Sequence, residues 1–331
     1  MKNCTCRSST SSSGVVQGVR GASFSIRPGE SLALVGESGS GKSVTSKAIM
    51  GLVDLPGRVV AGDVRFKGRS LLGKQGEKWS RQVRGRDISI VFQDPMTSLN
   101  PLLTVGTQLT EAVRHHRGLS KKQAWERAVE LLDLVGISFP RQRMEQYPHE
   151  FSGGMNQRVI IAMSLACEPE LLIADEPTTA LDVTIQAQIL ELLARLQEEL
   201  DLAILLITHD LGVVAGLCQK VAVMYAGRIV ETGDIDDMFT DAGHPYTRGL
   251  LSSTPRLDVV LPQLVSIPGS PPDLLKPPLG CAFHPRCTLA VDECSSVDPT
   301  LETYRSSRKV ACHRAFERDD AARSLSDQHG A

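Results

Sequence analysis

The chain has 331 residues, which is enough for one large domain and a smaller one. Its 36 Lys and Arg residues nearly balance 38 Asp and Glu residues, and the net charge of −2 gives no overall positive field that would favour nucleic acid or an anionic membrane surface. No apolar run approaches the roughly 20 residues that span a bilayer, and the polar start lacks the apolar core of a signal peptide. We therefore expect a cytosolic chain with no nucleic-acid partner, whose membrane role would come through other proteins.

The first hundred residues predict mainly strands. Residues 1–13 are polar and rich in serine, so we expect a disordered tail there and a domain that starts at residue 14. Beyond it, short apolar runs separated by Gly, Pro and polar turns predict strands. The first expected elements are two strands over 22–35, joined by a turn at 27–30, with the second strand at 31–35. A helix at 42–50, a hairpin at 62–68 and a strand at 87–92 are expected to follow.

From residue 94 to about 166 the pattern becomes helical, which predicts an inserted helical subdomain. Within it, Ser120 is expected to cap one helix and Gly136 to stop that helix. Strands and helices then alternate up to about residue 225. This alternation predicts an α/β fold with a mainly parallel sheet and helices on both of its faces.

A glycine-rich loop joins the strand expected at 31–35 to the helix expected at 42–50. Glycine is costly at such a junction unless the backbone itself must approach something closely. The loop follows the pattern G-x-x-x-x-G-K-[ST] of phosphate-binding loops, whose backbone N–H groups converge on an anion at the positive end of the next helix. Its residues are Gly36, Glu37, Ser38, Gly39, Ser40, Gly41, Lys42 and Ser43. Nucleotide binding is therefore predicted, with Lys42 reaching the β- and γ-phosphates and the Ser43 hydroxyl binding Mg²⁺.

Two adjacent carboxylates, Asp175 and Glu176, end a later apolar strand. A phosphate-loop ATPase requires both, because one carboxylate holds the Mg²⁺ shell and the other polarises the attacking water. We assign the first role to Asp175 and the second to Glu176. A second glycine-rich helix start lies upstream, where Ser152, Gly153 and Gly154 are suited to bind an anion.

Several motifs follow one another in a fixed order along the chain. They are the loop at 36–43, Gln93, Ser152-Gly153-Gly154, Asp175-Glu176, the TALD segment at 179–182 and His209. This ordered set resembles that of ABC-type ATPases, which implies an antiparallel β subdomain beside the main sheet and the helical insertion. The resemblance implies that Gln93 senses Mg²⁺ and the γ-phosphate and that His209 hydrogen-bonds the γ-phosphate. It also implies that the Ser152 segment contacts the γ-phosphate held by a second ABC ATPase subunit, with Asp182 helping to join the subunits.

ABC ATPases usually stack adenine on an aromatic side chain that precedes the phosphate loop. Residues 1–23 of this chain contain no Phe, Tyr or Trp. Three explanations are open: another residue serves, base stacking is weak here, or the start codon is mis-assigned.

Finer resemblances indicate the ATPase subunits of bacterial dipeptide and oligopeptide importers. They include FSGGM at 151–155, HPYTRGLL at 244–251, IPGSPPDL at 267–274 and GCAFHPRC at 280–287. This resemblance implies a peripheral motor on the cytoplasmic face of the inner membrane, which uses ATP and Mg²⁺ to drive peptide import. The implied partners are two membrane permease subunits, a second and distinct ABC ATPase and, indirectly, an external peptide-binding protein. The permease is expected to dock on residues 94–109.

Three alternatives stay open. Nickel or another small solute is an alternative substrate within the importer class. A soluble ABC ATPase of DNA repair or translation is less favoured, because such proteins usually carry tandem ATPase units or long coiled coils, whereas this chain has one phosphate loop and no sustained heptad pattern. A nucleotide-sensing module without catalysis is disfavoured, because both Glu176 and His209 are present.

Beyond residue 250 the composition changes, and a proline-rich stretch at 268–280 indicates a linker or irregular arm. We expect an ATPase domain over 14–250 and an irregular C-terminal extension over 251–331. Four of the eight cysteines lie in this extension, at Cys281, Cys287, Cys294 and Cys312. Their spacing matches neither ordinary zinc ribbons nor common ferredoxin runs. Free or buried thiols, a zinc site and a [4Fe–4S] cluster are all open, and the cluster is favoured because some similar peptide-importer ATPases carry one in this extension.

Overall fold

The computed structural model describes residues 2–10, 14–93, 98–179, 181–253, 266–305 and 308–315. Within this part, contacts group the chain into two compact units. Unit 1 comprises the described residues of Met1–Ser25, Leu32–Ser70 and Thr208–Ala331, and unit 2 comprises those of Ile26–Ser31 and Leu71–Ile207. Each unit buries apolar side chains of its own.

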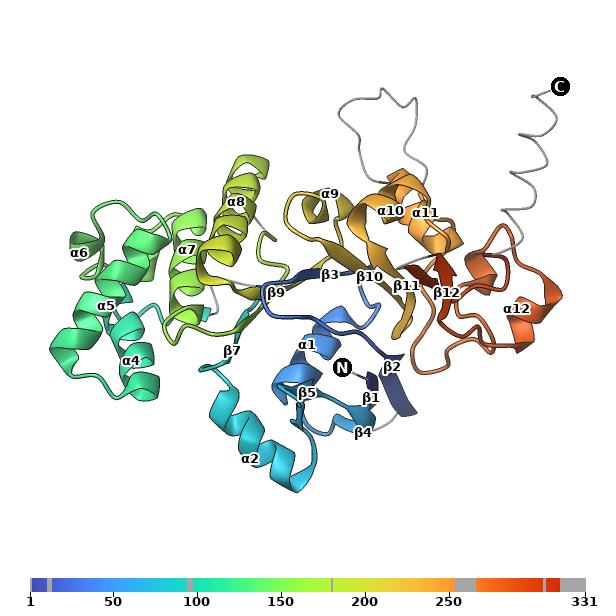
Figure 1. Cartoon of the computed structure of the whole chain (residues 1–331), viewed down its shortest axis with the longest axis horizontal. Helices are drawn as coiled ribbons and strands as arrows, with labels where there is room; N and C mark the ends of the chain where they lie inside the picture. Colours follow the sequence, from blue (N-terminus) through green and yellow to red (C-terminus); the bar gives the residue numbers. More distant parts are fainter. Residues whose placement is uncertain are drawn as a thin grey trace. The chain divides into compact units, whose positions relative to one another are not determined.

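Unit 1 is built on a mixed sheet (Figure 1). Its strands, in order across the sheet, are β12 (Glu302–Arg305), β13 (Arg308–Val310), β11 (Arg228–Asp234), β10 (Lys220–Tyr225) and β3 (Ser31–Val35). Strand β10 pairs parallel with β3 and antiparallel with β11. The sheet expected to be mainly parallel is therefore antiparallel on one side, because the two residues Ala226 and Gly227, both with positive φ, turn the chain directly from β10 into β11.

A second sheet of unit 1 is antiparallel, with the strand order β2 (Gly14–Ala22), β1 (Lys2–Thr10) and β4 (Arg58–Asp63). We expected a disordered tail over 1–13, and this is wrong for β1. The reason is that a ladder is made of backbone hydrogen bonds, so a polar segment can pair with two neighbouring strands. A short hairpin of β5 (Arg65–Phe66) and β6 (Arg69–Ser70) overlaps the hairpin expected at 62–68.

The first of the two strands expected over 22–35 does not form. Strand β2 ends at Ala22, and residues 23–30 adopt no strand although their apolar and polar side chains alternate. The turn expected at 27–30 is confirmed, since the Glu30 backbone N–H donates to the Arg27 carbonyl oxygen at 3.1 Å.

The strand, loop and helix around the glycine-rich segment form as expected. All five residues of β3 are buried. Helix α1 (Lys42–Met50) begins directly after Gly41, so that the last two residues of the loop lie in its first turn. It ends at Gly51, whose φ of 64° is the left-handed geometry of a helix stop. The loop is thus fixed between a buried strand and a helix with six buried residues.

Unit 2 contains a parallel set of strands, β9 (Ala203–Thr208), β8 (Leu171–Asp175) and β7 (Ile88–Val91). Val91 pairs with Ala174, and Asp175 pairs with Ile207. The carboxyl ends of these strands therefore lie along one edge, which is where open α/β sheets place their ligands.

The helices of unit 2 include the expected insertion, in which α4 to α7 gather into one cluster (Figure 1). They are α2 (Gly73–Val83), α4 (Val105–Arg117), α5 (Lys121–Leu134), α6 (Pro140–Arg143), η1 (Pro148–Glu150), α7 (Gly153–Ser164) and α8 (Val183–Leu200). Ser120 caps α5 in a capping box with Gln123, and Gly136 follows its end with a φ of 75°, so both expectations are confirmed. Among the described helices, none is long and apolar enough to cross a membrane.

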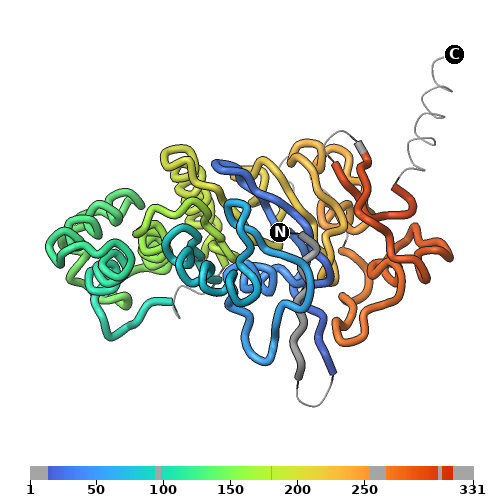
Figure 2. Tube along the Cα trace, turned by 60° about the horizontal axis from the view of Figure 1, so that its bottom comes forward, coloured from blue at the N-terminus to red at the C-terminus, as the bar shows by residue number. Residues whose placement is uncertain are grey.

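The remaining helices of unit 1 are α9 (Leu211–Val214), α10 (Ile235–Thr240), α11 (Pro245–Ser253), η2 (His284–Arg286) and α12 (Asp292–Ser296). The described residues of the C-terminal extension are orange to red in Figure 2, and their strand β13 pairs antiparallel with both β12 and β11. Most of the described residues between 266 and 301 lie outside helices and strands.

Gly39 and Gly41 both have left-handed backbone angles, with φ of 77° and 106°. A Cβ at Gly39 would meet nothing within 4 Å, whereas a Cβ at Gly41 would lie 2.2 Å from the Gly18 carbonyl oxygen. We expect Gly39→Ala to lower the free energy of unfolding by about 1–2 kcal/mol, the cost of a Cβ in this conformation. Gly41→Ala should lower it by about 3 kcal/mol or more, because the backbone must also shift. Urea unfolding measures both losses, and equal losses would contradict the close approach at Gly41.

Candidate functional site

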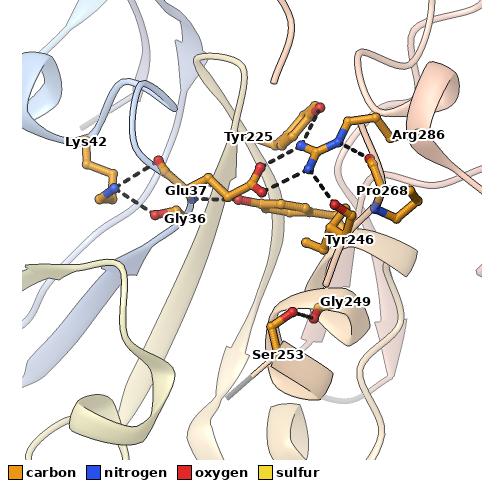
Figure 3. Close-up of polar contacts among 10 residues, drawn as sticks. Gly36, Glu37, Lys42, Tyr225, Tyr246, Gly249, Ser253, Pro268 and Arg286 are labelled. Atoms are coloured by element: carbon orange, nitrogen blue, oxygen red, sulfur yellow. Dashed lines mark hydrogen bonds and ion pairs between the residues drawn. The ribbon is translucent and has the colours of Figure 1, made fainter. Parts of the chain in front are cut away.

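The loop 36–43 leaves no space for a side chain at its first residue. A Cβ at Gly36 would lie 2.2 Å from the Met224 carbonyl oxygen. Lys42 is 4% exposed, and its Nζ donates to the carbonyl oxygens of Gly36 and Glu37 at 2.7 and 3.1 Å (Figure 3). The loop thus holds an ammonium group at the amino end of α1, where a helix favours anions.

The other residues of the loop differ in their exposure. Ser38 and Gly39 are exposed at its tip, Ser40 is buried, and Ser43 is half-buried in the first turn of α1. A serine hydroxyl at this place offers the hard oxygen donor that Mg²⁺ prefers.

In unit 2, the carboxylate of Glu176 is held from two sides. Its Oε2 accepts a hydrogen bond from Gln93 Nε2 at 2.9 Å and another from Thr179 Oγ1 at 3.0 Å. Glu176 also has a φ of 48°, a conformation that is uncommon for a residue other than glycine and that concentrates at functional sites. The backbone and two side chains therefore fix this carboxylate directly after β8.

The parallel pairing of β7 and β8 explains why Gln93 reaches Glu176. Because both strands end at the same edge, residues that follow them lie close together although they are 83 positions apart in sequence. Asp175 is the last residue of β8 and is 5% exposed. The edge thus carries two adjacent carboxylates and one amide.

The start of α7 is exposed. Ser152 is its N-cap, and the Ser152 hydroxyl accepts a hydrogen bond from the Met155 backbone N–H at 3.3 Å. Ser152 and Gly153 are exposed, whereas Gly154 is buried against Ile185. A Cβ at Gly154 would lie 2.7 Å from Ile185 Cγ2. The two glycines therefore differ: one keeps the surface open and the other allows close packing.

Two further residues of the expected motif set lie at the ends of secondary-structure elements. His209 directly follows β9 and is exposed. Asp182 is the N-cap of α8, where its Oδ1 accepts a hydrogen bond from the Ile185 backbone N–H at 3.0 Å. This capping contact is a role for Asp182 that its sequence pattern did not reveal.

The four cysteines of the extension lie near one another but do not form a ready set of metal ligands. The pKa of Cys312 is raised to about 11, mainly by burial and to a lesser extent by the neighbouring thiols Cys281, Cys287 and Cys294. The Cys281 backbone N–H also donates to the Cys294 carbonyl oxygen at 2.9 Å. Within the described residues, however, no three His, Cys, Asp or Glu side chains are arranged to hold a metal ion. The donor chemistry suits soft metals or an iron–sulfur cluster, while the arrangement of the side chains does not yet match one.

Each unit brings together its own share of the expected site. Unit 1 contains the loop 36–43, His209 and the four cysteines, and unit 2 contains Gln93, the segment 152–154, Asp175 and Glu176. Residues 94–97, the start of the segment expected to dock on a permease, lie outside the described residues.

The structure adds two residues to the surroundings of the loop, Tyr246 and Arg286. Both lie in the peptide-importer motifs at 244–251 and 280–287, but those motifs did not indicate a contact with the loop. Both contact Glu37 (Figure 3). The available signal was Glu37 itself, because an acidic side chain inside an anion-binding loop needs a cationic partner.

Comparison with known proteins identifies the family. Residues 19–179 match the ABC transporter family, and residues 230–294 match the family described as oligopeptide/dipeptide transporter, C-terminal region. The chain is 52% identical over 314 residues to the dipeptide transport ATP-binding protein DppD of Bacillus subtilis. The aligned residues make up 95% of this chain and 93% of that protein. It is 52% identical over 304 residues to the oligopeptide transport ATP-binding protein OppD of Escherichia coli, which covers 92% of this chain and 89% of that protein.

Solved structures agree on the fold. The dimeric structure of a post-hydrolysis state of the ATP-binding cassette MJ0796, bound to ADP and Pi, gives a TM-score of 0.62 at 27% identity and covers 71% of this chain and 97% of that chain. The structure of cbiO1 from Clostridium perfringens, part of the ABC transporter complex cbiONQ, gives a TM-score of 0.61 at 28% identity and covers 72% of this chain and 91% of that chain. The expected α/β fold of an ABC-type ATPase is confirmed. With these matches and the loop at the amino end of α1, the chain belongs to the ABC transporter ATP-binding proteins, in the dipeptide and oligopeptide branch.

Proposed function

We propose that the chain is the motor subunit of an ABC importer, and that it hydrolyses ATP to ADP and phosphate to drive the uptake of dipeptides or oligopeptides. The observation that carries this is 52% identity, over about nine-tenths of both chains, to proteins named for dipeptide and oligopeptide transport. The separate match at 230–294 supports the peptide class beyond the ATPase part.

The contacts within each unit support a role for each residue of the site. Lys42 would exchange its two carbonyl contacts for the β- and γ-phosphate oxygens, and the loop backbone would donate to the same phosphates. Ser43, Asp175 and Gln93 offer oxygen atoms of the kind that Mg²⁺ prefers, and the ion would neutralise charge on the phosphates.

Glu176 is the proposed base. Held by Gln93 and Thr179, its carboxylate would accept a proton from a water molecule whose oxygen bonds to the γ-phosphorus. The bond from that phosphorus to the β–γ bridging oxygen breaks at the same time and leaves ADP. His209 would donate a hydrogen bond to the γ-phosphate.

The exposed start of α7 supports a site shared between two subunits. Ser152 and Gly153 would contact the γ-phosphate of a partner ATPase, and a similar cassette has been solved as a dimer. By analogy with the transport proteins it resembles, the chain would act on the cytoplasmic face of the inner membrane with two permease subunits, a second ABC ATPase and, indirectly, an external peptide-binding protein.

Replacing Glu176 with Gln keeps the shape of the side chain and removes the base, so ATP should stay bound while turnover falls roughly 100-fold or more. Lys42→Ala should instead weaken ATP binding itself. Glu198→Gln, which changes an exposed carboxylate of α8, is the matched control and should leave both properties unchanged. Phosphate release by the assembled transporter measures turnover, and wild-type turnover in Glu176→Gln would sink the assignment.

A second prediction concerns the shared site. Ser152→Arg places a long cation at the exposed start of α7, which should abolish hydrolysis at the partner's site while ATP binding by the isolated chain persists. Ser120→Arg removes a cap of the same kind from α5 and should leave hydrolysis intact. If the isolated chain hydrolyses ATP at the full rate regardless of its concentration or of a partner, the shared site is wrong.

For the extension we propose that Cys281, Cys287, Cys294 and Cys312 hold a [4Fe–4S] cluster with a structural or redox-sensing role. The support is chemical: the pKa values of Cys281, Cys287 and Cys312 are raised mainly by burial and also by neighbouring thiols, and the Cys281 backbone N–H donates to the Cys294 carbonyl oxygen. Cysteine thiolates are the usual ligands of such clusters.

Protein purified without oxygen should then be brown, with broad absorbance near ~400 nm and about four irons per chain. Replacing any one of the four cysteines with Ser should bleach it, whereas Cys167→Ser and Cys218→Ser should not, because both of these thiols are buried elsewhere in the fold. Colourless, iron-free protein with reactive thiols would end the cluster proposal, and stoichiometric zinc would replace it.

A further inference from the structure

Glu37, the second residue of the phosphate loop, is tied to two residues far away in sequence. Its carboxylate accepts from both terminal nitrogens of Arg286, with Nη1 to Oε2 at 2.6 Å and Nη2 to Oε1 at 3.0 Å (Figure 3). Its backbone N–H donates to the Tyr246 hydroxyl oxygen at 2.7 Å. Arg286 and Tyr246 are 249 and 209 positions away, in the extension and in α11.

The Arg286 side chain is only 5% exposed and the Glu37 side chain is 25% exposed, so this ion pair is largely shielded from water. The parallel fork to a carboxylate is the strong geometry of an arginine ion pair. Its Nε donates to the Pro268 carbonyl oxygen at 2.8 Å, and its guanidinium lies 5.9 Å from the ring centroids of Tyr225 and Phe283. The hydrogen bonds to Glu37 are the main reason why the pKa of Arg286 is raised, so the side chain is always charged.

Tyr246 is fixed as firmly. It is 0% exposed and packs on Tyr225 and Phe283, with ring centroids 4.6 and 5.4 Å apart. The start of α11 is anchored by buried Glu231, whose carboxylate accepts from the backbone N–H groups of Gly243 and His244 at 2.6 and 2.9 Å. The hydroxyl that receives the Glu37 N–H therefore has little freedom to move.

These contacts bear on the loop backbone, whose N–H groups would donate to the phosphates. Before ATP binds, the Glu37 carbonyl oxygen also accepts from the Lys42 ammonium at 3.1 Å, so the position of Glu37 sets the place from which Lys42 moves to the phosphates. The Glu37 N–H is also engaged by Tyr246, which fixes the direction of that peptide group.

We propose that Arg286, with Tyr246, is a positioning residue for ATP, which holds the phosphate loop in its binding conformation through Glu37. This rests on the proposed role of the loop 36–43. Arg286 does not touch the nucleotide: its effect passes through the Glu37 carboxylate. The C-terminal extension is then a working part of the ATP site.

The test compares Arg286→Gln with Arg308→Gln in the full chain, assembled with its partner ATPase and permeases. Arg308 is a matched control, because it is also a buried arginine of the extension, 3% exposed and paired with Asp241 at 3.0 Å, but it makes none of the contacts to the loop. We expect Arg286→Gln to raise the KM for ATP about 10-fold and to change kcat by less than about twofold, because it removes one partner of an ion pair that is largely shielded from water. Arg308→Gln should lower the melting temperature and leave KM unchanged.

A double substitution shows whether the effect passes through Glu37. Glu37→Gln combined with Arg286→Gln should weaken ATP binding no more than Arg286→Gln does, because both remove the same contact. Arg286→Lys, which keeps the charge but not the fork, should restore part of the affinity. Tyr246→Phe removes only the hydroxyl, and should raise KM about threefold without unfolding the chain.

The outcomes separate the alternatives. A fall in melting temperature with unchanged KM in both Arg286→Gln and Tyr246→Phe would overturn the proposal and leave a merely structural ion pair. Additive losses in the double variant would exclude Glu37 as the route. Lys42→Ala tests the loop itself: if Lys42→Ala does not weaken ATP binding, the loop assignment fails, whereas if it does and Arg286→Gln has no effect, only the present proposal fails.

Discussion

The phosphate loop depends on close backbone contacts that no side chain could allow. Gly36 approaches the Met224 carbonyl oxygen at the end of β10, and Gly41 approaches the Gly18 carbonyl oxygen in β2. Because backbone meets backbone at both places, the positions of β2 and β10 fix the course of the loop and the start of α1. The course of the loop sets the position of Lys42. Glu37 contacts both Lys42 and Arg286, and so links the loop to the extension.

Elements whose signals are local could be predicted from the sequence. The strand β3, the helix α1 and the Ser120 cap of α5 each carry their own pattern within a few residues, and each forms as expected. The sequence pattern misleads where strand formation depends on a neighbouring strand. Segment β1 is polar yet forms a strand, whereas apolar and polar side chains alternate within residues 23–30 and no strand forms there. Pairing is a property of two segments, and one segment does not reveal it.

The same limit applies to the candidate site. Its residues could be named from spacing and resemblance, but their contacts join positions that only the fold brings together, such as Gln93 with Glu176 and Arg286 with Glu37. The residue types at Tyr246 and Arg286 are ordinary for a buried aromatic and an arginine. Only their hydrogen bonds to Glu37 show that residues 209 and 249 positions away in sequence contact the loop.

Strand β13 has a consequence for the solubility of the molecule. It pairs with β11 at Glu231 and Thr232, and so occupies an edge that would otherwise offer unpaired backbone groups to another chain. The outermost strand, β12, is only four residues long and contains Glu302 and Arg305, which makes it a poor template for further pairing. A chain cut after α11 would keep every ATPase motif and yet expose β11, and edge-to-edge association would then compete with assembly into the transporter.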